Sequence, residues 1–547
     1  MAGDEVPASS STVVNDYAPG FPQTERQTER TTRSAGRLPE LAGAAAGIPR
    51  AALRVAIGAM VFQAFFSMTH FGWQYRAEYG SFLLLVVLLL VGVKPWRELA
   101  AQPVSRAVLL FTGFLVLQAG YVTWVATPVS TSWGFPEQLT TASKLVRLGV
   151  FSCLLGWWLS LVPRAIPYLF ALMVLGLLSG VLIFMPWSEL TAVFNGQLRP
   201  RFGIPENLAG QLAAVAGWLA VCLLIASWYR GGGGKRKATL IVIGLTAYVG
   251  CFCALLFSQS RGAWLAFAVT LPAVMIGLWW MRSGSGRATR VLPLVIVAVL
   301  SGIVLLAARD IVSVRLSSTE RLLETQAESE MARFEGAGTA AHVAGTGRTG
   351  AVDSSRHARA TSGQRFEPAI SAGSKAPASE ASAARALQEE VAVKAVNIRL
   401  QLYELGVAKW RERPWLGWGM RSTHELIADA NLDSGGVSHV HLHNAYLDAL
   451  VGIGLVGAGL LGLVFVLLMR ELVLAWRSGV ITTATLWVFA GCFGIVLVAN
   501  AFDSLLWRFE YSRAPLEILF GCCIAYGLIR RRNSAARLAH INDGHRT

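Results

Sequence analysis

The sequence predicts an all-α polytopic membrane protein with about twelve spans and one large extramembrane loop. Hydrophobic residues make up 54% of the 547 residues and charged residues only 15%. The mean hydropathy is +0.49. Apolar stretches of about 20 residues, the length that crosses a bilayer as a helix, recur along the chain. These observations exclude a water-soluble globular protein.

The apolar stretches define the organisation of the chain. A polar tail at 1–49, without the apolar core of a cleavable signal peptide, is expected to be disordered. Nine spans follow within 50–307, a large loop occupies 308–443, three more spans lie within 444–530, and a second tail ends the chain. The expected spans are 51–73, 77–93, 105–126, 144–162, 165–186, 205–229, 238–258, 261–281, 290–307, 444–470, 481–501 and 513–530.

Lysine and arginine predict the orientation. Basic residues cluster in alternate short loops, for example at 230–237 and in the tail at 530–532, while 127–143 contains none. Because cytoplasmic loops carry the excess of Lys and Arg, both termini are expected in the cytoplasm and the large loop on the outer side. Much of the net charge of +15 is then explained by topology, so the charge does not indicate nucleic-acid binding.

The amino-acid composition varies along the large loop. Segments 311–335 and 383–411 have the composition of helices, whereas 336–380 is rich in Gly, Ala, Ser, Thr and Arg and is expected to be a disordered insert. Pro414 is expected to end the second of these helices, and Gly417 and Gly419 are expected to permit a tight turn after it. A short helix near 422–430 should follow.

Basic residues on the expected outer side are few, and several could meet at one depth of the membrane. Guanidinium groups bind phosphate oxygens through paired hydrogen bonds, so such a group is suited to a diphosphate. The alternative is that these side chains only extend to lipid headgroups. The candidates for binding are Lys144, Arg147, Arg199, Arg201 with nearby Asn207, and Arg261, while Arg513 and Arg413 are further basic residues of that side.

His443 and Asn444 lie at the start of the tenth expected span, within the pattern H-N-x9-G-x-x-G that Gly454 and Gly457 complete. An imidazole can accept a proton at neutral pH. On a continuous helix His443 and both glycines share one stripe, which would let that face pack closely on a neighbouring helix. A histidine that only caps the span is the alternative.

His439, His441 and His443 alternate, and an extended segment would present them on one face to a zinc ion. No nearby cysteine or closely spaced carboxylate completes such a site. We therefore expect no metal here.

Four motifs in this order resemble the O-antigen ligase superfamily. They are Arg201-Phe-Gly-Ile-Pro-Glu-Asn-Leu-Ala209, Ser258-Gln-Ser-Arg261-Gly-Ala263, Arg413-Pro-Trp-Leu-Gly417-Trp-Gly419, and His443-Asn444 with its two glycines. The resemblance covers about 50–530 without the insert.

The resemblance implies a glycosyltransferase of the bacterial inner membrane whose site faces the periplasm. It would move an O-antigen glycan from undecaprenyl diphosphate to a sugar hydroxyl of lipid A–core, with inversion and with neither metal nor cofactor. His443 would be the base and Arg261 would stabilise the leaving diphosphate. Lys144, Arg147, Arg199, Arg201 and Asn207 would bind the donor, and Asn444, Arg413 and Arg513 would support the acceptor side.

Three alternatives remain at this point. An O-antigen polymerase and a protein O-oligosaccharyltransferase use the same donor with other acceptors. The complete histidine–glycine pattern modestly favours the ligase. A transporter or flippase could also have about twelve spans, but transporters place ionisable groups near the midplane, and the apolar stretches here read as nearly free of charge. Oligomeric state and glycan structure are not specified by the sequence.

Overall fold

The computed structural model describes residues 48–69, 71–92, 94–125, 134–229, 234–280, 287–313, 397–420, 422–432, 439–507 and 509–544. The polar tail before residue 48, the insert at 336–380 and most of the helix expected at 311–335 lie outside the described residues. No β-strand occurs in the ranges above, so the all-α prediction is confirmed.

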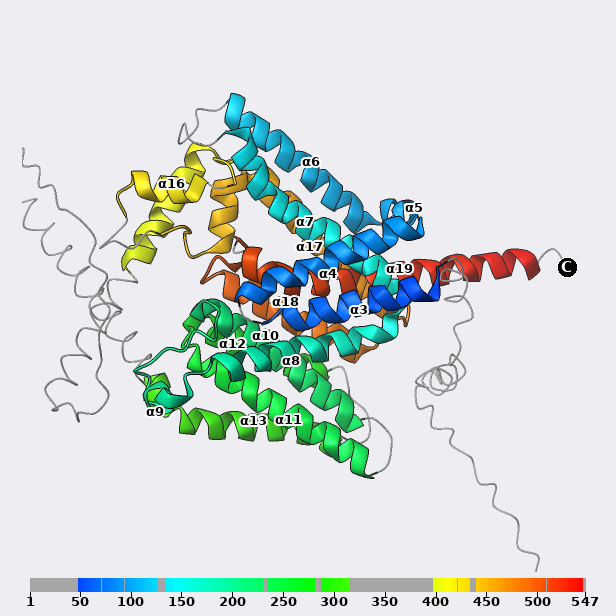
Figure 1. Cartoon of the computed structure of the whole chain (residues 1–547), viewed down its shortest axis with the longest axis vertical. Helices are drawn as coiled ribbons and strands as arrows, with labels where there is room; N and C mark the ends of the chain where they lie inside the picture. The colour runs from blue at the N-terminus through cyan, green and yellow to red at the C-terminus, as the bar shows by residue number, and fades with distance from the viewer. Residues whose placement is uncertain are drawn as a thin grey trace, which may run out of the picture. The chain divides into compact units, whose positions relative to one another are not determined.

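Every apolar stretch that the sequence marks as a span coincides with a helix in the structure (Figure 1). The helices in chain order are α3 (Arg50–Phe66), α4 (Phe71–Val91), α5 (Trp96–Ala100), α6 (Pro103–Trp124), α7 (Phe135–Leu161), α8 (Ile166–Phe184), α9 (Leu190–Phe194), α10 (Glu206–Tyr229), α11 (Gly234–Phe257), α12 (Arg261–Trp280), α13 (Arg287–Ala307), α16 (Ser422–Asp429), α17 (Ala445–Arg477), α18 (Thr483–Asn500) and α19 (Phe509–Gly544), with short 3₁₀ turns at Pro163–Ala165, Trp187–Glu189 and Leu505–Trp507.

Among the described helices, eight are long and apolar enough to cross a membrane, namely α6, α7, the Pro163–Phe184 helix that contains α8, α10, α11, α17, α18 and α19. Two further apolar helices are shorter, at Arg261–Val274 and Val295–Ala307. The chain is therefore a membrane protein.

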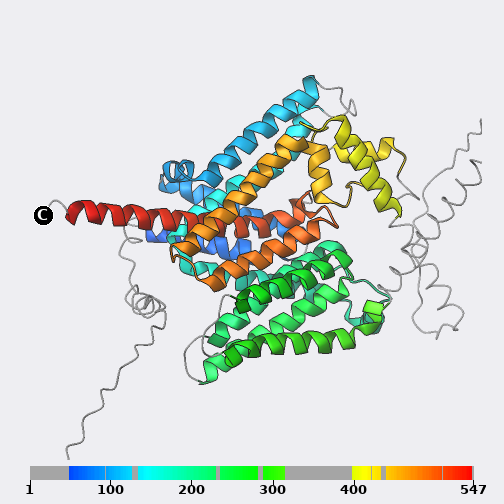
Figure 2. The ribbon, with the colours of Figure 1, turned by 180° about the vertical axis from the view of Figure 1, so that it is seen from behind.

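Two helices form the interior of the bundle. In the most apolar stretch of α19 all residues (100%) are buried, and in that of α10 83% of the residues are buried. α19 packs on α7, α17 and α4, whereas α10 packs on α11, α18 and α8 (Figures 1 and 2). Because α19 faces protein on all sides, it can carry polar residues that a lipid-facing helix could not.

The charges of that interior correct one expectation. Glu517 of α19 is fully buried and accepts hydrogen bonds from Gln63 of α3 (2.8 Å) and Ser81 of α4 (3.0 Å). Arg513 pairs with Glu517 (3.5 Å) and with Glu78 of α4. The apolar stretches are thus not nearly free of charge, and their charged groups are paired, as burial requires.

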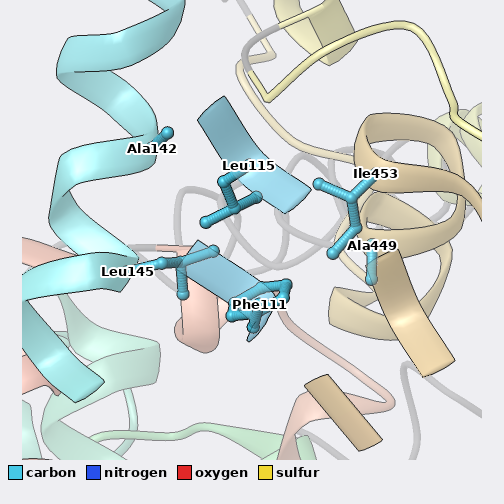
Figure 3. Packing of buried hydrophobic residues seen from close by; sticks show 6 residues of the cluster. All are labelled: Phe111, Leu115, Ala142, Leu145, Ala449 and Ile453. Atoms are coloured by element: carbon cyan, nitrogen blue, oxygen red, sulfur yellow. The ribbon is translucent and has the colours of Figure 1, made fainter. Parts of the chain in front are cut away.

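The first turns of α17 pack on α6 and α7 through an apolar cluster. Ala449 and Ile453 of α17 meet Phe111 and Leu115 of α6 (Figure 3). Ala142 and Leu145 of α7 complete the cluster. All six side chains are buried, so this end of α17 packs closely on α6 and α7 and its position is fixed.

α17 is broken at Gly454. There φ is 64° and ψ is −174°, a region that only glycine adopts readily. The backbone amides after the break, at Leu455 and Val456, donate to the carbonyls of Pro414 (2.8 Å) and Trp415 (3.1 Å). The expectation that Gly454 lies within a continuous helix is therefore wrong.

The carbonyls before the break are satisfied by the same loop. Val451 accepts from the Trp418 amide (2.8 Å) and Gly452 from the Gly419 amide (2.9 Å). Gln118 of α6 donates to the Gly452 carbonyl as well (2.8 Å). The loop at 414–419 thus fills the break, and irregular backbone is kept inside the protein, as a membrane demands.

Three local predictions are confirmed. The helix before the loop ends at residue 412, just ahead of Pro414. Gly417 and Gly419 have φ values of 71° and 110°. Gly457 does pack on a neighbour, because a Cβ there would lie 2.5 Å from Phe114 Cε1 of α6.

Gly454→Ala is expected to destabilise the protein. A Cβ at this position would lie 2.3 Å from the Trp415 carbonyl oxygen, and the backbone strain alone is worth about 1–3 kcal/mol. Thermal unfolding of purified protein in detergent, followed by tryptophan fluorescence, measures the effect as a lower Tm. Gly459→Ala is the matched control on the same helix, since nothing lies within 4 Å of its added Cβ. Equal Tm values for the two variants would contradict the proposed role of the break.

Candidate active site

His443 lies in the segment that leads into α17, with its backbone in the left-handed region at φ 55°. Asn444 follows as the N-cap, its side-chain oxygen accepting from the amides of Tyr446 and Leu447 (both 3.1 Å). Tyr403, on the helix at 397–412, donates its hydroxyl to the His443 carbonyl (3.3 Å). The capping role therefore belongs to Asn444, which leaves the imidazole of His443 available for other contacts.

Asp503 is the acidic neighbour of His443. His443 Nδ1 lies 3.6 Å from Asp503 Oδ1, and the side chains are 19% and 4% exposed, respectively. The backbone amide of Ser504 donates to the same oxygen of Asp503 (2.8 Å). A carboxylate beside Nδ1 favours the ring tautomer whose other nitrogen, Nε2, can accept a proton.

Arg199 is held by two hydrogen bonds in the loop before α10. Its Nε donates to the Ser258 carbonyl and its Nη2 to Asn207 Oδ1, both at 2.6 Å. Gln259 Nε2 donates back to the Leu198 carbonyl (3.2 Å). The loop that carries Arg199 is therefore fixed to the turn that precedes Arg261.

Further charged groups surround Arg199. Burial is the main cause that lowers the pKa of its guanidinium, and the nearby cations Arg399 and Arg261 lower it further, while Glu206 and Asp503 act in the opposite direction. Asp503 thus acts electrostatically on Arg199 and also lies beside His443. The candidate site therefore combines three cations and an imidazole with the carboxylates of Glu206 and Asp503.

The turn before α12 brings Arg261 next to the segment that carries Asp503. Arg261 is the first residue of α12 and is half-buried. A Cβ on Gly262 would lie 2.9 Å from Phe502 Cβ, so only glycine permits this approach. Gln259 has φ 50°, which completes the sharp turn into the helix.

Of the predicted site residues, the structure groups His443, Arg199, Asn207 and Arg261. Arg201 is 81% exposed and pairs with Glu206 (2.9 Å). Lys144 is half-buried on α7. Their predicted contact with the donor stays a prediction.

Arg147, Arg513 and Arg413 occupy other surroundings. Arg147 of α7 pairs with Glu78 (3.3 Å), the carboxylate that also pairs with the buried Arg513. Arg413 places its guanidinium carbon 3.8 Å from the centre of the Trp418 ring, inside the loop that fills the break in α17. These contacts hold helices and loop together.

Sequence reasoning missed Asp503, Arg399 and Tyr403. Burial is the main cause that raises the pKa of the Tyr403 hydroxyl, and Arg399, Asp503 and Asp448 also act on it. A signal was present for Asp503, because it is an acidic residue at the end of an apolar stretch. The tyrosine and arginine lie on a helical segment with no feature that separates them from other charged residues.

A histidine zinc site is not formed by the described residues, where no group of three His, Cys, Asp or Glu side chains has the arrangement to hold a metal. The rings of His439 and His443 lie edge to face with centroids 5.9 Å apart.

Residues 246–462 match the family described as O-antigen ligase. This stretch of the chain is similar to the O-antigen ligase family. The resemblance to that superfamily is thereby confirmed, and glycosyl transfer of the O-antigen ligase or polymerase type is supported at the level of the family. The matched stretch includes Arg261, Arg399 and His443 of the candidate site, whereas Arg199 and Asp503 lie outside it. No curated protein matches the chain.

Proposed function

We propose that the protein is an O-antigen ligase of the inner membrane. It takes its glycan from undecaprenyl diphosphate and transfers it to a sugar hydroxyl of lipid A–core on the periplasmic side. The observation that carries the proposal is the pair of His443 and Asp503 beside the cations Arg199, Arg261 and Arg399. The family match gives the reaction type, and these residues supply what that reaction needs.

The reaction is one displacement at the anomeric carbon. The acceptor oxygen forms the new bond to that carbon while the bond to the diphosphate oxygen breaks, so the configuration inverts. His443 takes the proton of the acceptor hydroxyl through Nε2, and Asp503 stabilises the imidazolium that forms. The two side chains are 3.6 Å apart without substrate, and the proposed reaction requires this distance to shorten when substrate binds.

The arginines act on the leaving group. Negative charge grows on the diphosphate as its bond breaks, and cations already in place at that point lower the barrier. Arg261 stands at the N-terminus of α12, where the helix dipole adds positive potential. Three guanidinium groups supply the charge for which other enzymes use a divalent cation, so we propose a metal-independent reaction.

The remaining predicted residues have graded roles. Arg201 can leave Glu206 and bind a phosphate with little loss of free energy, because an ion pair this exposed is weak. Lys144 would contact the donor from α7, and Arg147 would do so as well, because its side chain stays 36% exposed beside Glu78. We assign Arg413 and Arg513 to support of the site, since each is already engaged within the protein.

The test uses purified protein, an undecaprenyl-diphosphate glycan and lipid A–core, with and without a chelator. Glycan-capped lipopolysaccharide that forms in both conditions is the expected product. Longer carrier-linked chains would instead make the protein a polymerase, and a glycosylated protein acceptor would make it a protein O-oligosaccharyltransferase. Loss of the product with chelator would overturn metal independence alone.

A further inference from the structure

Asp448 is a buried carboxylate in the first turn of α17 that the proposed reaction does not use. It is 5% exposed. Its Oδ1 accepts from the backbone amide of Leu442 (3.1 Å), and its Oδ2 accepts from the hydroxyl of Ser504. Leu442 and Ser504 are 1% and 0% exposed, so both hydrogen bonds are shielded from water.

These two partners flank the reacting pair. Leu442 immediately precedes His443, and Ser504 immediately follows Asp503. One carboxylate therefore joins the two backbone segments that carry the imidazole and its acidic neighbour. The segments are 60 residues apart in the chain, so their relative position depends on such contacts.

The backbone at His443 also needs support. A residue other than glycine at φ 55° is strained, and strain of this kind persists only where the surroundings fix it. The hydrogen bond from Leu442 to Asp448 holds one side of His443, and the Asn444 cap holds the other. Tyr403 holds the His443 carbonyl from the loop.

We propose that Asp448 is the positioning residue that sets the geometry between His443 and Asp503. It touches neither substrate nor the reacting atoms. Loss of its carboxylate leaves a buried amide and a buried hydroxyl without an acceptor, and both segments then shift to find one. The proposal rests on the proposed function for its effect on rate, but its structural effect is independent of substrate.

The first experiment compares Asp448→Ala with wild type in the transfer assay across pH. The expected result is a kcat lowered about 10- to 100-fold, a part of the roughly 10²–10⁴ that a general base contributes, with little change in KM for the donor. The limb of the pH–rate profile on the acid side shifts, because the imidazole has lost its fixed carboxylate. Asp448→Asn should recover most of the rate, since its amide can accept from Leu442 and donate to the Ser504 hydroxyl.

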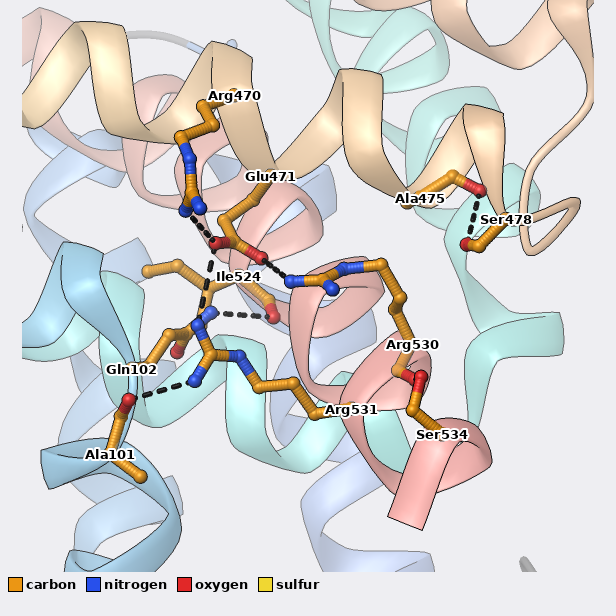
Figure 4. Close-up of polar contacts among 10 residues, drawn as sticks. All are labelled: Ala101, Gln102, Arg470, Glu471, Ala475, Ser478, Ile524, Arg530, Arg531 and Ser534. Atoms are coloured by element: carbon orange, nitrogen blue, oxygen red, sulfur yellow. Dashed lines mark hydrogen bonds and ion pairs between the residues drawn. The ribbon is translucent and has the colours of Figure 1, made fainter. Parts of the chain in front are cut away.

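Glu471→Gln is the matched control. Glu471 is a fully buried carboxylate on the same helix, at its other end, where Arg470 (3.1 Å), Arg530 (2.9 Å) and Arg531 (3.4 Å) pair with it (Figure 4). Its loss should lower Tm and leave the pH–rate profile of the folded protein as in wild type. An Asp448→Ala variant that behaves like this control, with normal kcat per folded molecule, overturns the proposal.

Hydrogen exchange tests the positioning role of Asp448 without relying on the proposed glycosyl transfer. The backbone amides of peptides that cover 439–444 and 502–504 should exchange faster in Asp448→Ala than in wild type. In Glu471→Gln their exchange rates should equal those of wild type. If wild type transfers no glycan, the proposed function falls, and the exchange data still decide whether Asp448 fixes the two segments. Equal exchange in Asp448→Ala and wild type refutes the positioning role whatever the activity.

Discussion

Replacing His443 with alanine is expected to lower the transfer rate about 10²- to 10⁴-fold, the usual contribution of a general base. The reason is that His443 is the imidazole paired with Asp503, so its loss removes the group that we propose accepts the acceptor's proton. KM for the donor should change little, because the arginines bind the diphosphate. Steady-state kinetics in the assay with purified protein give kcat and KM separately.

His424→Ala provides the control, since this histidine lies on α16 outside the reacting pair. Asp503→Asn adds a second comparison. It keeps the size of the side chain and removes its charge, so the imidazolium loses its stabilising neighbour and the rate should fall less than in His443→Ala. For a base, the wild-type rate also falls as pH decreases, because protonation removes the lone pair that accepts the proton. A pH-independent rate in the acid range would mean that His443 only orients the acceptor.

The sequence predicts the helices of this protein well because membrane spans have a local signature. An apolar run of sufficient length must form a helix in lipid, whatever it later packs against. The stop at Pro414 and the turn at Gly417 and Gly419 are local in the same sense. Such features need no knowledge of distant parts of the chain.

The break in α17 could not be predicted in this way. Helical spacing places Gly454 and Gly457 on one face, and only Gly457 serves the expected packing. Gly454 is required because the loop at 414–419, some 40 residues earlier in the chain, enters the helix there. Periodicity reports which residues share a face but not which segment will interrupt it.

The site was predicted in part for a related reason. Motifs and the scarcity of basic residues on the expected outer side single out His443, Arg199 and Arg261 as candidates. The carboxylates are not singled out in this way, because Asp503 and Glu78 matter only through their partners, His443 in one case and Arg147 in the other. Ion pairs between distant helices have no sequence pattern.

Replacing Arg261 with alanine is expected to lower kcat about 10²- to 10³-fold, as the loss of one preorganised donor to a developing anion does. Its fixed position supports this: the turn at Gln259 and the approach of Gly262 to Phe502 leave the first residue of α12 little freedom. The effect should fall on kcat more than on KM, because the charge on the diphosphate grows as the bond breaks. Single-turnover kinetics with a saturating donor measure the chemical step directly.

Arg261→Lys should restore only a part of the rate. Lysine keeps the charge but binds phosphate as a single point, whereas the guanidinium offers paired N–H donors in a plane. Arg309→Ala is the control for loss of one positive charge, since Arg309 is 81% exposed and pairs with Asp310 (3.7 Å). Full activity in Arg261→Lys would show that charge alone is needed. Full activity in Arg261→Ala would instead transfer the stabilising role to Arg199 and Arg399, the two other cations of the site.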